Sequence, residues 1–183
     1  MRLITGLMSS LLVVATPAVG HEYEQSSGTA PDGTRFYQDS LVIRAPAKAL
    51  WNGFTETSAY RNWAAPVSSV DFRIGGTIEA SYDPKGHLGD PDNIKNEFIA
   101  YIPGRLLVFR NVQAPGQLPG REAYGHTVKT VEFTPVDSTH TRVTVSGVGF
   151  GKGTSYDQLY AFFSEGDGEM LTTLKRAMER SKR

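Results

Sequence analysis

Four histidines and a few acidic side chains are the residues of this sequence whose types suit acid–base chemistry. His87 lies in a loop rich in Gly, Pro and Asp, and His140 lies at a hairpin turn, so we expect both rings in solvent. His126 begins a strand after a long loop. As a general base it would need a carboxylate to orient its ring, and Glu122 is the nearest one in the sequence. The spacing therefore offers one weak catalytic pair.

Two further stretches have the composition of a phosphate or metal site, but their spacing is wrong. The stretch "SGVGFGKGTS" resembles a phosphate-binding loop, yet Lys152 is followed by Gly153 where a Ser or Thr would hold magnesium. Asp83, Asp90 and Asp92 share one loop without the spacing of a calcium-binding EF-hand. The chain has no cysteine, which removes thiol nucleophiles and thiolate ligands. The sequence predicts neither a metal site nor a cofactor.

Length and charge narrow the class of protein. A chain of 183 residues is long enough for one domain with a substantial core. Lys and Arg together number 19, and so do Asp and Glu, so the formal net charge is zero. Because nucleic acids and anionic lipids attract proteins with a basic excess, we expect no nucleic-acid partner.

The first twenty residues have the pattern of a secretory signal peptide. An apolar run from Leu3 to Ala15 follows one Arg, and small residues stand at Ala18 and Gly20. The run is shorter than the roughly 20 apolar residues that span a membrane, so we expect no stable membrane insertion after cleavage. The predicted cut lies between Gly20 and His21, which makes the mature protein periplasmic or secreted.

The rest of the chain divides into a leader and one domain. Residues 21–34 are polar and rich in Gly and Ser, and we expect a flexible leader there. Residues 35–183 form the predicted domain. An exported chain without cysteine has no disulfides, so burial of apolar surface must stabilise it.

Hydrophobic periodicity predicts the elements of this domain. A strand ends near Pro46, two short helices follow, and the second helix ends before Pro66. About six antiparallel strands come next, with a bend expected at Gly75 and Gly76. The last segment, from Ser155, has an apolar stripe of period 3.6 and is predicted to be one long helix.

Three features of that last helix stand out. Gly166 and Gly168 interrupt it, and we expect a kink there. Glu165, Asp167 and Glu169 alternate around the same point, and we expect them to face solvent rather than to form an acid–base pair. The predicted class is α+β: a curved antiparallel sheet of six to seven strands wrapped on the C-terminal helix, with the two short helices closing one end.

The order of the stretches "IRAPAKALWNGFTETSAYRNWAAP", "VDFRIGGTIEASYD", "PGRLLVF" and "TRVTVSGVGF" resembles the START-like superfamily, also called SRPBCC. Within it the chain is similar to the branch related to the C-terminal domain of the Hsp90 ATPase activator, over Ser40 to Met178. The resemblance implies a helix-grip fold that encloses an apolar pocket between the sheet and the last helix. It also implies that lipids, sterols, polyketides or plant hormones are typical ligands, and that a minority of members are cyclases or dehydratases.

The chain departs from this branch in two ways. Members usually carry Gly-Trp in the last helix, and this sequence has Gly166 followed by Asp167, which changes the shape of the implied pocket. A secreted member also cannot meet a cytosolic chaperone, so we expect no Hsp90 partner.

Large apolar side chains that alternate along the predicted strands and helices are the candidates for the pocket lining. They are Trp51, Trp63, Ile78, Tyr82, Phe98, Phe109, Phe133, Tyr160 and Phe163. Any one of them can equally fill a core. Tyr82 and Tyr160 are of most interest because a buried phenol needs a hydrogen-bond partner, which a ligand could supply.

Three functions remain open at this point. The leading prediction is a protein that binds a small hydrophobic molecule without catalysis. The second is a cyclase, dehydratase or hydrolase of aromatic or polyketide-like compounds, with proton transfer by His126, Tyr82 or Glu97. The third is a protein-interaction module that uses the loops 83–92 and 112–125.

Overall fold

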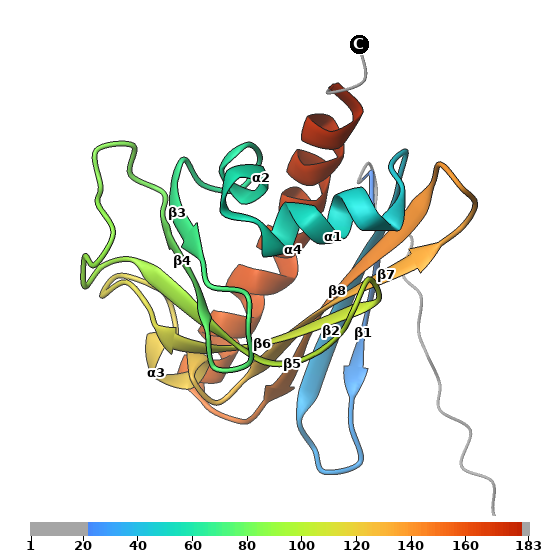
Figure 1. Cartoon of the computed structure of the whole chain (residues 1–183). Helices are drawn as coiled ribbons and strands as arrows, with labels where there is room; N and C mark the ends of the chain where they lie inside the picture. Colours follow the sequence, from blue (N-terminus) through green and yellow to red (C-terminus); the bar gives the residue numbers. More distant parts are fainter. Residues whose placement is uncertain (1–21, 181–183) are drawn as a thin grey trace, which may run out of the picture.

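The computed structural model describes residues 22–180. The predicted signal peptide and the predicted cut between Gly20 and His21 lie outside the described residues. Within the described part, a curved sheet wraps around one long helix (Figure 1). The same part contains no helix that is both long and apolar enough to cross a membrane.

Eight antiparallel strands form a single sheet in the order β1-β2-β8-β7-β6-β5-β4-β3. Because β1 and β3 are the two edges, the sheet is not closed into a barrel. The strands are β1 (Glu24–Thr29), β2 (Arg35–Ile43), β3 (Val67–Val70), β4 (Thr77–Ser81), β5 (Ile94–Ile102), β6 (Leu106–Gln113), β7 (Val128–Pro135) and β8 (Thr141–Phe150).

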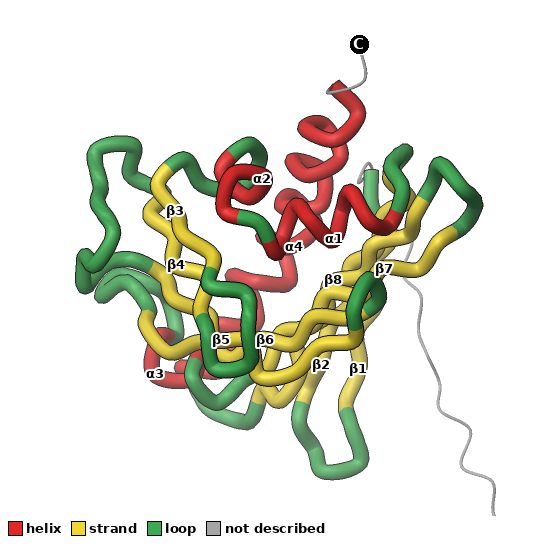
Figure 2. The backbone as a smooth tube through the Cα atoms, in the orientation of Figure 1, coloured by secondary structure: helices red, strands yellow, loops and turns green. Residues whose placement is uncertain are grey.

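The helices are α1 (Ala47–Thr55), α2 (Thr57–Arg61), α3 (Arg121–Tyr124) and α4 (Thr154–Arg180). Figure 2 shows the strands curving around α4, while α1 and α2 lie toward the end of the molecule where α4 finishes. The Met178 side chain of α4 lies close to Gly53 of α1, which joins the short-helix pair to α4. This is the predicted α+β helix-grip architecture.

Side-chain alternation explains how the sheet faces α4. Along β2, Tyr37, Asp39, Leu41 and Ile43 are buried and the residues between them are more exposed. The period of two puts these four side chains on the concave face, where α4 covers β2 and β8. A carboxylate in this otherwise apolar row is unusual, and it becomes important at the functional site.

The prediction of a flexible leader over residues 21–34 is wrong, because this segment contains β1. The strand pairs with β2 along its whole length, from Glu24 opposite Ser40 to Thr29 opposite Arg35. Its sequence has no apolar alternation because it is an edge strand held by backbone hydrogen bonds and polar contacts. The Gln25 side chain, for example, donates to Asp39 at 2.9 Å. β1 is the strand that raises the total from the six or seven expected to eight.

The glycines have roles that differ in part from the expected ones. Gly75 and Gly76 do not bend one strand but form the turn between β3 and β4, with Gly75 at a φ of +76°. A side chain at Gly76 would overlap the carbonyl oxygen of Asp71. In α4, the helical structure continues without interruption through Gly166 and Gly168.

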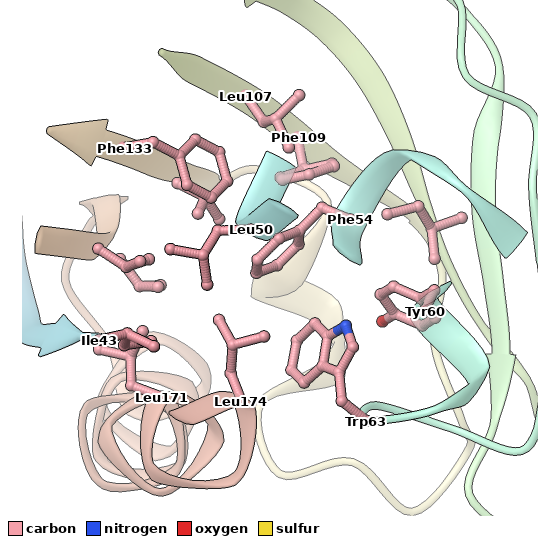
Figure 3. Packing of buried hydrophobic residues seen from close by; sticks show 14 of the residues in the cluster. Ile43, Leu50, Phe54, Tyr60, Trp63, Leu107, Phe109, Phe133, Leu171 and Leu174 are labelled. Atoms are coloured by element: carbon pink, nitrogen blue, oxygen red, sulfur yellow. The ribbon is translucent and has the colours of Figure 1, made fainter. Parts of the chain in front are cut away.

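The main core lies between α4, α1 and the middle of the sheet. Figure 3 shows Leu171 and Leu174 projecting from α4 toward Leu50 of α1 and Phe133 of the sheet. A second cluster of buried side chains lies at the other end of α4, where it covers the ends of β2 and β8. Its buried members are Tyr37, Ala114, Ala123, Tyr124, Phe150, Leu159 and Phe163.

Candidate ligand-binding site

A cavity of about 610 Å³ lies between α4 and the half of the sheet made by β4 to β7. We call this cavity the cleft. Residues from α1, α2, α3 and the loop before α3 complete its wall. Its aromatic lining residues are Phe54, Tyr60, Trp63, Tyr82, Phe109, Tyr124, Phe162 and Phe163. The polar and charged ones are Asn96, Gln117, Lys129, Asp167, Glu169 and Thr173.

The cleft is open to solvent on one side. Tyr82 follows β4 and is 64% exposed, and Phe162 of α4 is 46% exposed, although both line the cleft. Large aromatic side chains at an opening are well placed to contact a ligand that enters. Tyr82 stands at the rim as a largely exposed residue, but its phenol group is withdrawn from solvent and hydrogen-bonds with that of Tyr60, and burial raises its pKa. The expectation of a buried phenol therefore holds for the hydroxyl and not for the whole residue.

The structure places five of the nine predicted lining residues in the cleft: Trp63, Ile78, Tyr82, Phe109 and Phe163. Trp63 is almost fully buried, and its indole N–H donates to the Gly53 carbonyl at 2.8 Å. That hydrogen bond fixes the ring as a rigid part of the wall.

Three of the other four fill the core instead of lining the cleft. Trp51 packs edge-on against Phe72, with ring centres 5.5 Å apart, and against Phe133 at 5.9 Å. Phe98 and Phe133 are completely or almost completely buried among other side chains. Trp51 is only partly buried where it packs on this core, and none of the three residues borders the cleft.

Tyr160 also lies outside the cleft. It stands in the first two turns of α4, above the ends of β2 and β8, with its ring 5.8 Å from that of Tyr37 and 5.2 Å from that of Phe150. The Arg35 guanidinium lies 4.8 Å from its ring centre. This end of α4 is packed, so the predicted empty space begins only further along the helix.

The most polar part of the cleft is an ion pair that the sequence analysis missed. The Lys129 ammonium on β7 lies 2.7 Å from the Asp167 carboxylate on α4. The Tyr37 hydroxyl donates to the other Asp167 oxygen at 2.5 Å. Lys129 also lies 3.9 Å from the centre of the Phe163 ring, a cation–π distance.

The prediction that Asp167 faces solvent is wrong, because its exposed fraction is only 4%. Two features of the sequence pointed to this site. Asp167 occupies the position where the resemblance implied a tryptophan. Lys129 alternates with Val131 and Phe133 along β7 and so belongs to the inward face.

A second carboxylate, Asp39, lies near this ion pair and is completely buried. One of its oxygens accepts the Gln25 hydrogen bond, while the other has no hydrogen-bond partner in the described part of the chain. Burial raises the pKa of the Asp39 carboxyl to about 7. The negative charge of Asp167 adds to this rise, and Gln25 and Lys129 oppose it.

The buried phenols of the cleft stay protonated near neutral pH. Burial raises the pKa of both Tyr60 and Tyr124, and the charge of Asp167 raises that of Tyr124 further. The Tyr124 hydroxyl lies 3.5 Å from the side-chain oxygen of Asn96, which also accepts a hydrogen bond from Asn111 at 3.1 Å. These groups are hydrogen-bonding groups rather than acids or bases at pH 7.

Two of the three residues predicted to transfer protons do not line the cleft. Glu122 on α3 and His126 just after that helix are both exposed and outside the cleft lining. Glu97 on β5 forms an ion pair with Arg110 at 2.9 Å and faces away from the cleft lining. Only Tyr82 of the three contributes to it, at the rim. The charged groups that line the cleft are Lys129, Asp167 and Glu169 instead.

The sequence of the chain matches a known protein family. The model of the family described as "Activator of Hsp90 ATPase homolog 1-like protein" matches residues 44–179, most of the chain. The chain belongs to this family. No curated protein matches the sequence.

Solved structures of similar fold come from varied organisms. The Aha1 dimer from Colwellia psychrerythraea has a TM-score of 0.61 and 17% identity, over 80% of this chain and 97% of that one. CalU16 from Micromonospora echinospora has a TM-score of 0.59 and 16% identity, over 88% of this chain and 77% of that one. A norcoclaurine synthase variant from Thalictrum, in complex with a transition-state analogue, has a TM-score of 0.58 and 13% identity, over 82% of this chain and 97% of that one.

These likenesses confirm the fold, and the family match confirms the resemblance to the branch related to the Hsp90 ATPase activator. At such low identities they carry no information on ligands. A member of this Hsp90-activator-like family has a fold that is compatible with ligand binding or with a cyclase-like role, and the residues of the cleft must decide between them.

Proposed function

We propose that this protein binds a small, mostly apolar molecule in the cleft. The observation that carries the proposal is a cavity of about 610 Å³ with aromatic walls and a few polar groups at one end. Ligand sites in proteins typically measure roughly 300–1,000 Å³ and have this mixed lining. The loop between β6 and β7 contributes Pro115, Leu118 and Tyr124 to the wall, so it serves the cleft rather than a separate protein-interaction surface.

Binding without catalysis fits the state of the titratable groups. A general acid or base works best when its pKa lies near the operating pH and its proton is free to move. Lys129 and Asp167 neutralise each other, and the phenols of Tyr60 and Tyr124 have raised pKa values that keep them protonated. A cyclase-like enzyme, the alternative, would have to use the Lys129–Asp167 pair, Glu169 or Tyr82, because His126 and Glu97 lie outside the cleft lining.

The test of binding is a substitution that fills the cleft without touching the core. Gly166 lines the cleft, and a Cβ atom built on it meets no other atom within 4 Å. The variant Gly166→Leu therefore places its side chain in the open space. We expect the purified wild-type protein to bind the neutral fluorescent probe N-phenyl-1-naphthylamine and the variant to bind it at least about tenfold more weakly.

The matched control is Ala161→Leu, which adds a leucine to the exposed, cleft-remote side of the same helix. We expect its affinity for the probe to equal that of the wild type. Extraction of the wild-type protein and mass spectrometry of the extract would identify a copurified ligand. Absence of probe binding, or equal binding by Gly166→Leu, would contradict the proposal.

We also propose that the protein acts after export, because the first twenty residues have the signal-peptide pattern. The described part of the chain is consistent with a mature chain that starts at His21, since Glu22 already pairs with Lys175 of α4 at 2.6 Å. N-terminal sequencing of the protein from whole cells and from the extracellular or periplasmic fraction would check this. Recovery of an intact chain from the cytoplasm alone would count against it.

A further inference from the structure

The Lys129 ammonium is the charged donor in the cleft lining, and it has hydrogen-bonding capacity left over. An ammonium group has three N–H donors. Asp167 accepts one of them, and the Phe163 ring covers another side of the group at 3.9 Å. Because Lys129 also lines the cleft, a donor remains for an acceptor atom of a bound molecule.

Asp167, by contrast, is already fully engaged. One of its oxygens accepts from Lys129 and the other from the Tyr37 hydroxyl, and the residue is almost completely buried. A ligand that offers a hydrogen-bond donor would have to displace one of these partners. Around this ion pair the cleft therefore favours an acceptor on the ligand.

The charge balance at this end opposes an additional negative charge. Lys129 carries one positive charge, which Asp167 neutralises at 2.7 Å. The buried Asp39 carboxyl lies close enough to Asp167 for that charge to raise its pKa, so the cluster already resists one further anion. A ligand carboxylate would be that further anion, and it would also lose its hydration in an apolar site.

The walls of the cleft indicate what the rest of the ligand looks like. Phe54 and Trp63 lie with ring centres 4.9 Å apart on one side, and Tyr124 and Phe163 lie 4.7 Å apart on another. Figure 3 shows Phe54, Tyr60, Trp63 and Phe109 gathered together where they face the cleft. Rings that pack in this way offer faces and edges to another ring system.

We propose that the ligand is an uncharged aromatic compound with a carbonyl oxygen that accepts a hydrogen bond from Lys129, and that the cleft discriminates against the corresponding carboxylates. This inference rests on the proposed binding function and adds the chemical class of the ligand. The ion pair sets the selectivity, because Asp167 cancels the charge of Lys129 without removing its donor.

Three probes of similar shape test the selectivity directly on the wild-type protein: naphthalene, 2-acetylnaphthalene and 2-naphthoate. Their affinities can be measured by displacement of N-phenyl-1-naphthylamine. We expect 2-acetylnaphthalene to bind at least about tenfold more tightly than either of the others, because only it adds an acceptor without adding a charge.

Two variants assign this preference to the ion pair. In Lys129→Met we expect 2-acetylnaphthalene to fall to the affinity of naphthalene. In Asp167→Asn, where the lysine charge is no longer cancelled, we expect 2-naphthoate to gain at least about tenfold relative to 2-acetylnaphthalene. Lys175→Met is the matched control, since Lys175 also pairs with a carboxylate, Glu22, but lies outside the cleft lining.

The outcomes separate the two proposals. If N-phenyl-1-naphthylamine binds but 2-naphthoate equals or exceeds 2-acetylnaphthalene in the wild type, the inference is overturned and the proposed function stands. An unchanged preference in a folded Lys129→Met, checked by its thermal unfolding, would overturn it as well. If no probe binds to the wild type, the proposed function itself fails.

Discussion

Replacement of the buried Asp39 by Asn is expected to stabilise the protein at alkaline pH and not at acidic pH. The Asp39 carboxyl has a raised pKa of about 7, against a usual value of 3.8. Since one pKa unit corresponds to about 1.4 kcal/mol, ionised Asp39 destabilises the folded state by roughly 4 kcal/mol at most. The groups that face it are Gln25 on β1, Lys129 on β7 and Asp167 on α4.

The sign of the pH dependence follows from proton binding. Between about pH 4 and pH 7 the folded protein keeps the Asp39 proton and the unfolded chain has released it, so the folded state binds more protons. The free energy of unfolding therefore falls as the pH rises through this window, and stays low above it. The variant Asp39→Asn is always neutral and keeps an oxygen that can accept the Gln25 hydrogen bond.

The measurement is urea unfolding of wild type and Asp39→Asn at pH 4.5, 6 and 8. We expect the variant to exceed the wild type by about 2–4 kcal/mol at pH 8 and by less than about 1 kcal/mol at pH 4.5. The contributions of carboxyls remote from Asp39 are the same in both proteins and cancel in the difference. Asp71→Asn, on an exposed carboxylate, controls for the loss of one charge. A difference that is flat with pH, or a variant less stable at pH 8, would refute the reasoning.

Two further predictions concern α4. Gly166→Ala should raise the free energy of unfolding by about 1 kcal/mol, because alanine favours the helix and finds open space there. Gly168→Ala should lower the free energy of unfolding, because its methyl group would overlap the Tyr23 ring that packs on the helix. Equal shifts of the two variants in urea unfolding would contradict this. The single variant Asp167→Leu should lose about 3–5 kcal/mol of its free energy of unfolding, because it leaves Lys129 unpaired, and the double variant with Lys129→Met should recover most of this loss. Thermal and urea unfolding of both variants measure this. A double variant that recovers nothing would instead mean that the pair itself stabilises the fold.

Most of the fold could be predicted because its signals are local. The alternation in β2 and the period of 3.6 in α4 indicate which side of each element is buried. The sequence of β1 has no hydrophobic pattern of this kind. Its residues are polar, and it is held by pairing with β2 and by Gln25, so nothing within residues 24–29 distinguishes it from a loop.

The cleft was predicted only in part, because periodicity shows which face of an element a side chain takes and not which neighbours it meets there. Trp51 and Trp63 are both inward-facing aromatics near the short helices. Trp51 packs against Phe72 and Phe133 outside the cleft, while Trp63 lines the cleft. Which neighbours each tryptophan meets depends on how α1 and α2 sit on the sheet, which is a property of the tertiary structure.

The burial of Asp167 could not be predicted from its local sequence either. An aspartate between two glutamates looks like a solvent-exposed helix position, and the reason that Asp167 is buried lies on other elements. Lys129 comes from β7 and Tyr37 from β2, and the Tyr37 ring fits over β8 only because Gly147 has no side chain. Three distant segments must meet before the carboxylate has partners.

A buried Lys–Asp pair is a weak source of stability, because the loss of hydration offsets most of the attraction between the charges. We therefore explain its presence in a mostly apolar cleft by the proposed ligand binding rather than by the stability of the fold. With Asp167 bound to it, the Lys129 ammonium stays a hydrogen-bond donor but ceases to attract anions. An apolar pair in the same place would leave the cleft open to any hydrocarbon of the right size, whereas a lone lysine would select carboxylates. On the proposed function, the pair gives the cleft a preference that neither residue alone can provide.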